Sequence, residues 1–184
     1  MNLALTSYWH RLRYRTRQFW HYLGWASASP DLEKARSILN PKQMALFNQL
    51  QTTEKLHSLN VLDKLMRAGE SQTDLLVAAL LHDVGKVKSP LRLWERVWIV
   101  LGKVFLPHQV KAWEAGTPTS RSSWKKPFAI AAQHPIWGAE MATEAGTSPL
   151  ATALIRRHQE ALPGQPRTTE EHLLRKLQQA DGGE

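Results

Sequence analysis

The sequence predicts an all-α protein, and three observations support this fold class. Apolar residues recur at spacings of three and four, as in Leu56, Leu59, Leu62 and Leu65, which is the period of one helix face. Alternating apolar and polar runs long enough for a strand are missing. Pro and Gly separate the helical runs along the chain. Together these features predict a bundle of roughly eight to ten helices.

Each predicted helix lies between recognisable start and stop signals. Thr73-Asp74 is typical of a helix N-cap, and the segment 116–126 (GTPTSRSSWKK) predicts a loop because it is rich in Ser, Thr and Lys. The expected boundaries are Asn40-Pro41, Ala68-Gly69, Ser89-Pro90, Leu106-Pro107, His134-Pro135, Gly146, Ser148-Pro149 and Pro163-Gly164.

Length and composition limit the type of protein. A chain of 184 residues is long enough for one domain with a real core. Cysteine is absent, so any metal must be held by histidines and carboxylates. No stretch reaches the roughly 20 apolar residues that span a bilayer, and the N-terminus lacks the order of a signal peptide. We therefore expect a cytoplasmic protein, with a peripheral place at the membrane as the alternative.

The net charge of +8 comes from two basic segments. Residues 1–30 carry four arginines and no acidic residue, and residues 85–126 carry nine Lys or Arg against Glu95 and Glu114. Basic segments attract phosphate groups. Residues 8–25 (YWHRLRYRTRQFWHYLGW) combine this charge with aromatic residues. This arm either packs its aromatic side chains on the domain or makes weak contact with a membrane surface or nucleic acid.

Four of the eight histidines lie in or beside apolar helical runs: His57, His82, His134 and His158. Imidazole is the natural ligand for divalent metals in a chain without cysteine, and carboxylates complete such sites. The spacings of about 25 residues within each pair suit two antiparallel helix pairs with ligands facing a common axis.

Two aspartates extend this set. Asp83 follows His82 directly, and adjacent residues on a helix are about 100° apart, so the two side chains can flank one metal or Asp83 can bridge two. Asp181 follows the apolar run that ends at Ala180 and precedes Gly182. Taken alone, Asp181 is typical of a helix terminus. Together with the other residues it predicts a metal ligand.

The chain resembles the HD superfamily of metal-dependent phosphohydrolases over roughly residues 53–184. His57, then His82-Asp83, then Asp181 match the H…HD…D signature, and HDVGK is close to the HDIGK form of HDIG-type members. The resemblance implies an HD-type bundle in residues 51–184, which would be the metal-binding catalytic domain. Residues 1–50 would form an N-terminal helical extension without a counterpart in the shared core.

The resemblance also implies the ligand set. His57, His82, Asp83 and Asp181 would hold one metal ion. HPIWGAE and RRHQE are similar to two further family elements, so His134 and His158 would hold a second metal that Asp83 bridges. One departure concerns the second metal, because the stretch Arg157-His158-Gln159-Glu160 has one histidine where many members have two. The cofactor is thus one or two divalent ions, with Mn, Fe, Mg, Ni, Co and Zn as candidates.

The implied reaction is hydrolysis of a phosphoester or phosphodiester in a nucleotide, a cyclic dinucleotide or a related phosphorylated metabolite. Asp83 would orient the metals, and Lys86, one turn further on, would serve catalysis and substrate binding through a phosphate oxygen. Arg92 and Arg96 lie four residues apart on one predicted helix face, where like charges are unfavourable unless an anion lies between them. Both arginines are therefore candidate substrate-binding residues, and the alternative is two solvated side chains.

Two alternatives use the same residues. HD-fold proteins similar to myo-inositol oxygenase hold two irons and activate oxygen, and histidine with carboxylate ligands suits iron. The chain could also be a non-catalytic metal-binding sensor or scaffold that residues 1–30 dock to a membrane or nucleic acid. The sequence sets neither the substrate nor the oligomeric state.

Overall fold

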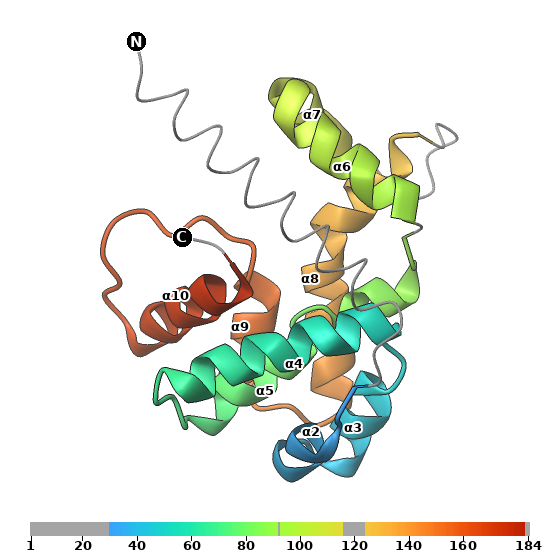
Figure 1. Ribbon diagram of the computed structural model, residues 1–184. Helices are drawn as coiled ribbons and strands as arrows, with labels where there is room; N and C mark the ends of the chain where they lie inside the picture. Colours follow the sequence, from blue (N-terminus) through green and yellow to red (C-terminus); the bar gives the residue numbers. More distant parts are fainter. Residues whose placement is uncertain (1–29, 92, 116–123, 183–184) are drawn as a thin grey trace. The chain divides into compact units, whose positions relative to one another are not determined.

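The computed structural model describes residues 30–91, 93–115 and 124–182 (Figure 1). Every regular element in these ranges is helical, with nine α-helices and one 3-10 helix. The prediction of an all-α fold is therefore confirmed. No helix in these ranges has the length and apolar character needed to cross a membrane. The basic aromatic arm at residues 8–25 lies outside the described residues.

Contacts divide the chain into two compact units. Among the described residues, the site unit contains 30–90 and 132–182, and the hairpin unit contains 91, 93–115 and 124–131. Helix α8, Lys126–Glu144, contributes its first turns to the hairpin unit and the rest to the site unit. The domain boundary expected at residue 50 stays a prediction, while residues 30–50 belong to the same site unit as residues 51–90.

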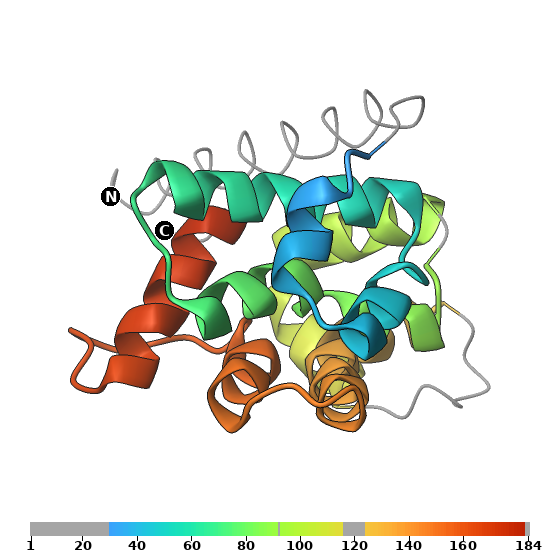
Figure 2. The ribbon, with the colours of Figure 1, turned by 90° about the horizontal axis from the view of Figure 1, so that it is seen from below.

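Helix α5, Thr73–Leu81, is the centre of the site unit. All seven residues from Leu75 to Leu81 are buried, as expected for a helix that is apolar on every side. Figure 1 shows α4 running along α5, and Figure 2 shows α2 and α3 side by side. The helices that contact α5 are α2 (Glu33–Ile38), α3 (Pro41–Phe47), α4 (Thr52–Arg67), α9 (Pro149–Arg157) and α10 (Thr169–Asp181).

Local sequence signals fix where these helices begin. Three helices start with a capping box, in which the cap side chain and the third helical residue exchange hydrogen bonds with the backbone. Helix α5 instead begins at Thr73, with Gln72 as the cap, one residue earlier than a cap at Thr73 would place it. The capping-box pairs are Asn40 with Gln43 for α3, Gln51 with Glu54 for α4, and Thr168 with Glu171 for α10.

One predicted boundary is wrong. Helix α8 continues through Pro135, where the sequence indicated a stop. A proline costs one backbone hydrogen bond inside a helix, but here the next turn packs tightly on the 3-10 helix η2, Val84–Lys88. A Cβ on Gly85 would lie 1.9 Å from the carbonyl oxygen of His134 and 2.6 Å from the nitrogen of Gly138. His134 and Gly138 lie one helical turn apart on the same side of α8. Their shared contact with Gly85 therefore favours a helix that continues through Pro135.

The hairpin unit has a small core of its own. Helices α6, Leu93–Phe105, and α7, Pro107–Glu114, contact each other. The buried Phe128 lies beneath Gly102, where a Cβ would come within 2.6 Å of its ring. The ring centres of Trp113 and Phe128 lie 5.0 Å apart. Leu106 separates the two helices and Pro107 is the first residue of α7, so the boundary predicted at Leu106-Pro107 is confirmed.

Candidate metal centre

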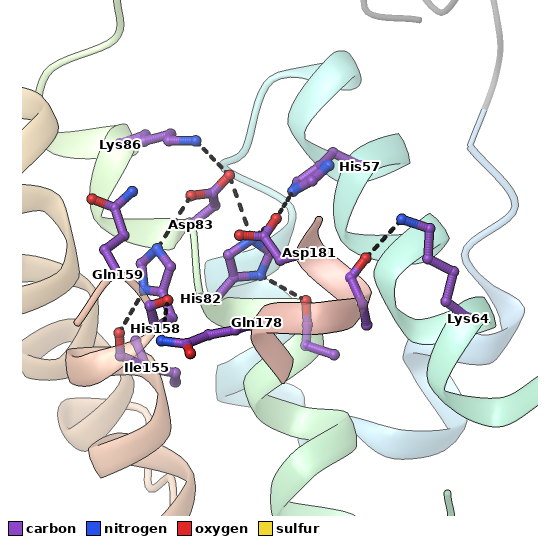
Figure 3. Close-up of polar contacts among 12 residues, drawn as sticks. His57, Lys64, His82, Asp83, Lys86, Ile155, His158, Gln159, Gln178 and Asp181 are labelled. Atoms are coloured by element: carbon purple, nitrogen blue, oxygen red, sulfur yellow. Dashed lines mark hydrogen bonds and ion pairs between the residues drawn. The ribbon is translucent and has the colours of Figure 1, made fainter. Parts of the chain in front are cut away.

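Asp83 lies between two groups of histidines in the site unit. It is 3 % exposed and follows the last turn of α5 directly. Its Oδ2 is 3.6 Å from His82 Nε2 (Figure 3). Its Oδ1 is 3.4 Å from His134 Nε2. Each carboxylate oxygen therefore faces a different group, which is the arrangement that a bridging ligand needs.

The first group consists of His57, His82 and Asp181, with Oδ2 of Asp83. His57 comes from α4, and Asp181 is the last residue of α10. Asp181 Oδ1 lies 2.7 Å from His57 Nε2 and 3.6 Å from His82 Nε2. One ligand atom each from His57, His82 and Asp83 lies within 4.8 Å of the others. Four side chains from three parts of the chain thus meet at one point.

The second group consists of His134 and His158, with Oδ1 of Asp83. His134 is a residue of α8, and His158 follows the last turn of α9. Their Nε2 atoms lie 3.3 Å apart, and His158 Nε2 is 4.0 Å from Asp83 Oδ1. Both histidines are at most 4 % exposed. The structure therefore brings together all six residues that the sequence predicted as metal ligands; ligation itself stays a prediction.

His82 and His158 are oriented by the same backbone contact. Each is the C-cap of its helix. His82 Nδ1 donates to the carbonyl oxygen of Ala79 at 2.9 Å, and His158 Nδ1 donates to that of Ile155 at 2.8 Å. A carbonyl oxygen can only accept, so Nδ1 carries a proton in both rings, and in the neutral form of each ring the lone pair lies on Nε2. Nε2 of both rings lies on the side of Asp83.

This donor set fits a divalent cation. The Nε2 atom of His82 is buried without a hydrogen-bond partner, although carboxylate oxygens of Asp83 and Asp181 lie 3.6 Å away. In the neutral ring the Nε2 lone pair faces these negative oxygens, and this arrangement is stabilised when a proton or a metal cation lies among them. Imidazole nitrogen and carboxylate oxygen are ligands of first-row divalent metals, and the carbonyl partners of Nδ1 are the usual outer contacts of metal-bound histidines.

The charges of the first group are strongly coupled. Burial opposes the charged form of His82, but Asp83 and Asp181 outweigh burial and raise its pKa to about 9. Burial also opposes ionisation of both aspartates. For Asp83, Lys86 and His82 nevertheless lower the pKa well below its ordinary value. His82 and His57 do the same for Asp181. The two carboxylates are therefore negative at neutral pH.

His158 has the opposite tendency. Burial is the largest cause, and the neighbouring His82 and His134 add to it, so that the pKa of His158 falls to about 3. His158 is therefore neutral at physiological pH and already in the form that binds a metal. At neutral pH His82 of the first group is therefore protonated, whereas His158 of the second group is not.

Gly85 explains how η2 brings Asp83 to His134. Because Gly85 has no side chain, the backbone of the turn lies directly against α8 at His134 and Gly138. Any larger residue at position 85 would clash with backbone atoms, which cannot rotate away. The glycine of HDVGK therefore sets the distance between Asp83 and the second group.

The predicted catalytic and substrate-binding residues have different outcomes. Lys86 Nζ lies 2.5 Å from Asp83 Oδ2, so this lysine is an ion-pair partner of the proposed bridge. Arg92 lies outside the described residues. Arg96 belongs to α6, but its side chain is not among those that the structure describes. Substrate binding by Lys86, Arg92 and Arg96 stays a prediction.

Sequence reasoning missed three residues around the centre. Lys64 of α4 donates to the carbonyl oxygen of Ala180 at 2.7 Å, next to Asp181. Gln178 donates through Nε2 to the carbonyl oxygens of His158 at 3.1 Å and Glu160 at 2.7 Å. Gln159 Nε2 lies 3.5 Å from His134 Nε2. Gln178 precedes Asp181 by three residues, and this spacing places both on one helix face, a signal that the sequence did contain.

The comparisons with known proteins agree with this geometry. The family model described as HD domain matches residues 56–181. No curated protein and no solved structure matched the chain. The match covers more than half of the chain and runs from the residue before His57 to Asp181, the first and last members of the first group. The protein belongs to the HD domain family.

Proposed function

We propose that this protein is a metal-dependent phosphohydrolase that cleaves a phosphoester or phosphodiester bond. The observation that carries the proposal is the position of Asp83, with one carboxylate oxygen toward each histidine group. Membership of the HD domain family adds to it. The substrate class is a nucleotide, a cyclic dinucleotide or a related phosphorylated metabolite.

The residues of the chain prepare the site for this chemistry. Lys86 holds Oδ2 of Asp83 and keeps the carboxylate ionised. The backbone carbonyls of Ala79 and Ile155 fix the rings of His82 and His158. Bound divalent ions would supply a water of lowered pKa and positive charge for the phosphoryl oxygens. The six side chains would hold one or two such ions, with Mn, Fe, Mg, Ni, Co and Zn as candidates.

Lys86 has a second role in the proposal. Its side chain is 21 % exposed, whereas that of Asp83 is 4 % exposed. The ammonium group therefore lies at the solvent side of the carboxylate, where a phosphate oxygen would reach it. Arg92 and Arg96 follow in the chain, and the proposal assigns them to the same phosphate. A phosphorylated substrate would be attracted by the basic charge of this segment.

The test is phosphate release by the full-length protein from a panel of phosphomonoesters, nucleotides and cyclic dinucleotides. Metals are removed with a chelator and restored one type at a time, and each assay is run under air and under argon. We expect hydrolysis that needs metal and not oxygen. Turnover that requires both iron and oxygen, or hydrolysis that persists in His82→Ala, would contradict the proposal. His172→Ala is the matched control, because His172 is exposed on α10.

A further inference from the structure

Most of the exposed large apolar side chains lie in the hairpin unit. Seven large apolar side chains are exposed among the described residues, and five of them lie between residues 91 and 131. The other two, Met66 and Ile136, lie in the site unit. We call the five the hairpin face: Trp94 at 56 %, Leu101 at 39 %, Phe105 at 68 %, Leu106 at 37 % and Trp124 at 44 % exposed.

Three residues of the hairpin face lie on one side of α6. At about 100° per residue, Trp94, Leu101 and Phe105 fall within roughly 40° of one another around the helix axis. A different side of α6 carries Ile99 and Gly102, which face the small core around Phe128. The helix therefore has one apolar side that the core uses and a second apolar side that is exposed.

The net charge of residues 91–131 indicates what kind of partner this face would contact. By sequence, residues 91–131 carry seven Lys or Arg and two Glu. Among the described side chains, Lys111 is exposed and Lys125 lies 5.0 Å from the centre of the Trp124 ring. A second copy of the chain would bring the same positive charge to the interface. Residues 1–30 are basic as well, so charge disfavours both as partners and favours an anionic one.

The apolar side chains distinguish between anionic partners. Leu101 and Leu106 offer aliphatic surface that does not stack on bases, so a nucleic acid would leave it in water. A lipid surface takes up Trp, Phe and Leu from one helix face while basic residues contact its headgroups. We propose that the hairpin face docks the protein on the surface of an anionic phospholipid membrane.

The test is sedimentation of full-length protein with vesicles of phosphatidylcholine, with and without phosphatidylglycerol. We expect binding to the anionic vesicles that weakens as salt is added. In the double variant Trp94→Ser/Phe105→Ser, partitioning should fall about tenfold or more, because two large apolar side chains no longer enter the lipid. Met66→Ser is the matched control, since Met66 is 45 % exposed in the site unit, and it should bind like the unchanged protein.

Three results would overturn the proposal. Equal binding of the double variant would assign membrane contact to another segment, with residues 1–30 as the first candidate. Binding to a single-stranded polynucleotide but not to vesicles would identify a nucleic-acid surface. A concentration-dependent dimer that the double variant abolishes, without vesicle binding, would identify a second copy as the partner. The melting temperature of each variant checks that these exposed substitutions leave the fold intact.

Discussion

His82 and His158 occupy equivalent positions on two different helices. Each follows the last helical turn and donates its Nδ1 proton to the carbonyl oxygen three residues earlier. The terminal carbonyls of a helix lack backbone partners, so this contact satisfies the helix end and orients the ring at the same time. Asp83 follows His82 in the chain. Its Oδ2 faces Nε2 of His82, and its Oδ1 faces Nε2 of His158.

The pKa of His82 predicts a proton release. At neutral pH this side chain is protonated, because its pKa is raised to about 9, and a metal can bind only after the proton leaves. Metal binding to the first group should therefore release one proton, and its affinity should fall about tenfold for each pH unit below 9. Calorimetry of metal binding in buffers of different ionisation enthalpy measures this release.

The second group supplies the comparison. His158 is neutral well above pH 3, so it contributes no proton when a metal binds between pH 6 and 8. The two binding steps should differ in pH dependence, with the first steeper. Equal proton release in both steps, or none in either, would contradict the assigned charge states.

Gly85→Ala should destabilise the fold and separate Asp83 from the second group. Its Cβ would lie 1.9 Å from the carbonyl oxygen of His134, and overpacking of this kind costs about 3 kcal/mol. Urea denaturation measures the loss in the free energy of unfolding, and metal analysis measures the bound ions.

Gly164→Ala is the matched control for that substitution. Gly164 has a φ of +75° and no atom within 4 Å of a new Cβ, so alanine should cost about 1 kcal/mol through backbone strain. Metal content should not change. A loss in Gly164→Ala as large as that in Gly85→Ala would show that steric contact with α8 is not the cause.

Lys64 and Gln178 should act on different metal groups. Lys64 anchors the end of α10 beside Asp181, whereas Gln178 holds the carbonyl oxygen of His158. Lys64→Met should weaken binding at the first group, and Gln178→Leu at the second, each by roughly tenfold, which is typical of residues that orient metal ligands. Calorimetric titration with metal resolves the two steps.

Lys176→Met controls for general weakening of α10. Lys176 also ties this helix to another segment, through Glu70 at 2.7 Å, but it contacts neither group. Its substitution should leave both metal affinities unchanged. If all three variants weakened both steps equally, the effect would be loosening of α10 rather than positioning of ligands.

Much of the centre could be predicted from the sequence because its residues have strong local signals. His82 and Asp83 end the apolar run of α5, and Asp181 ends the apolar run of α10. The predicted break at Pro135 was wrong because packing of Gly85 against Gly138 outweighs the tendency of proline to end a helix. Contacts such as that of Lys64 with Ala180 depend on how α10 docks on α4, which no local pattern encodes.

Metal content of Asp83→Ala tests the central claim most directly, because Asp83 is the residue that both groups share. We predict that purified Asp83→Ala loses the metal of both groups and all metal-dependent phosphate release. Asp63→Ala, a surface position paired with Lys34, should keep both. Full metal occupancy in Asp83→Ala would contradict the account, because the two groups would then hold their ions without a shared carboxylate.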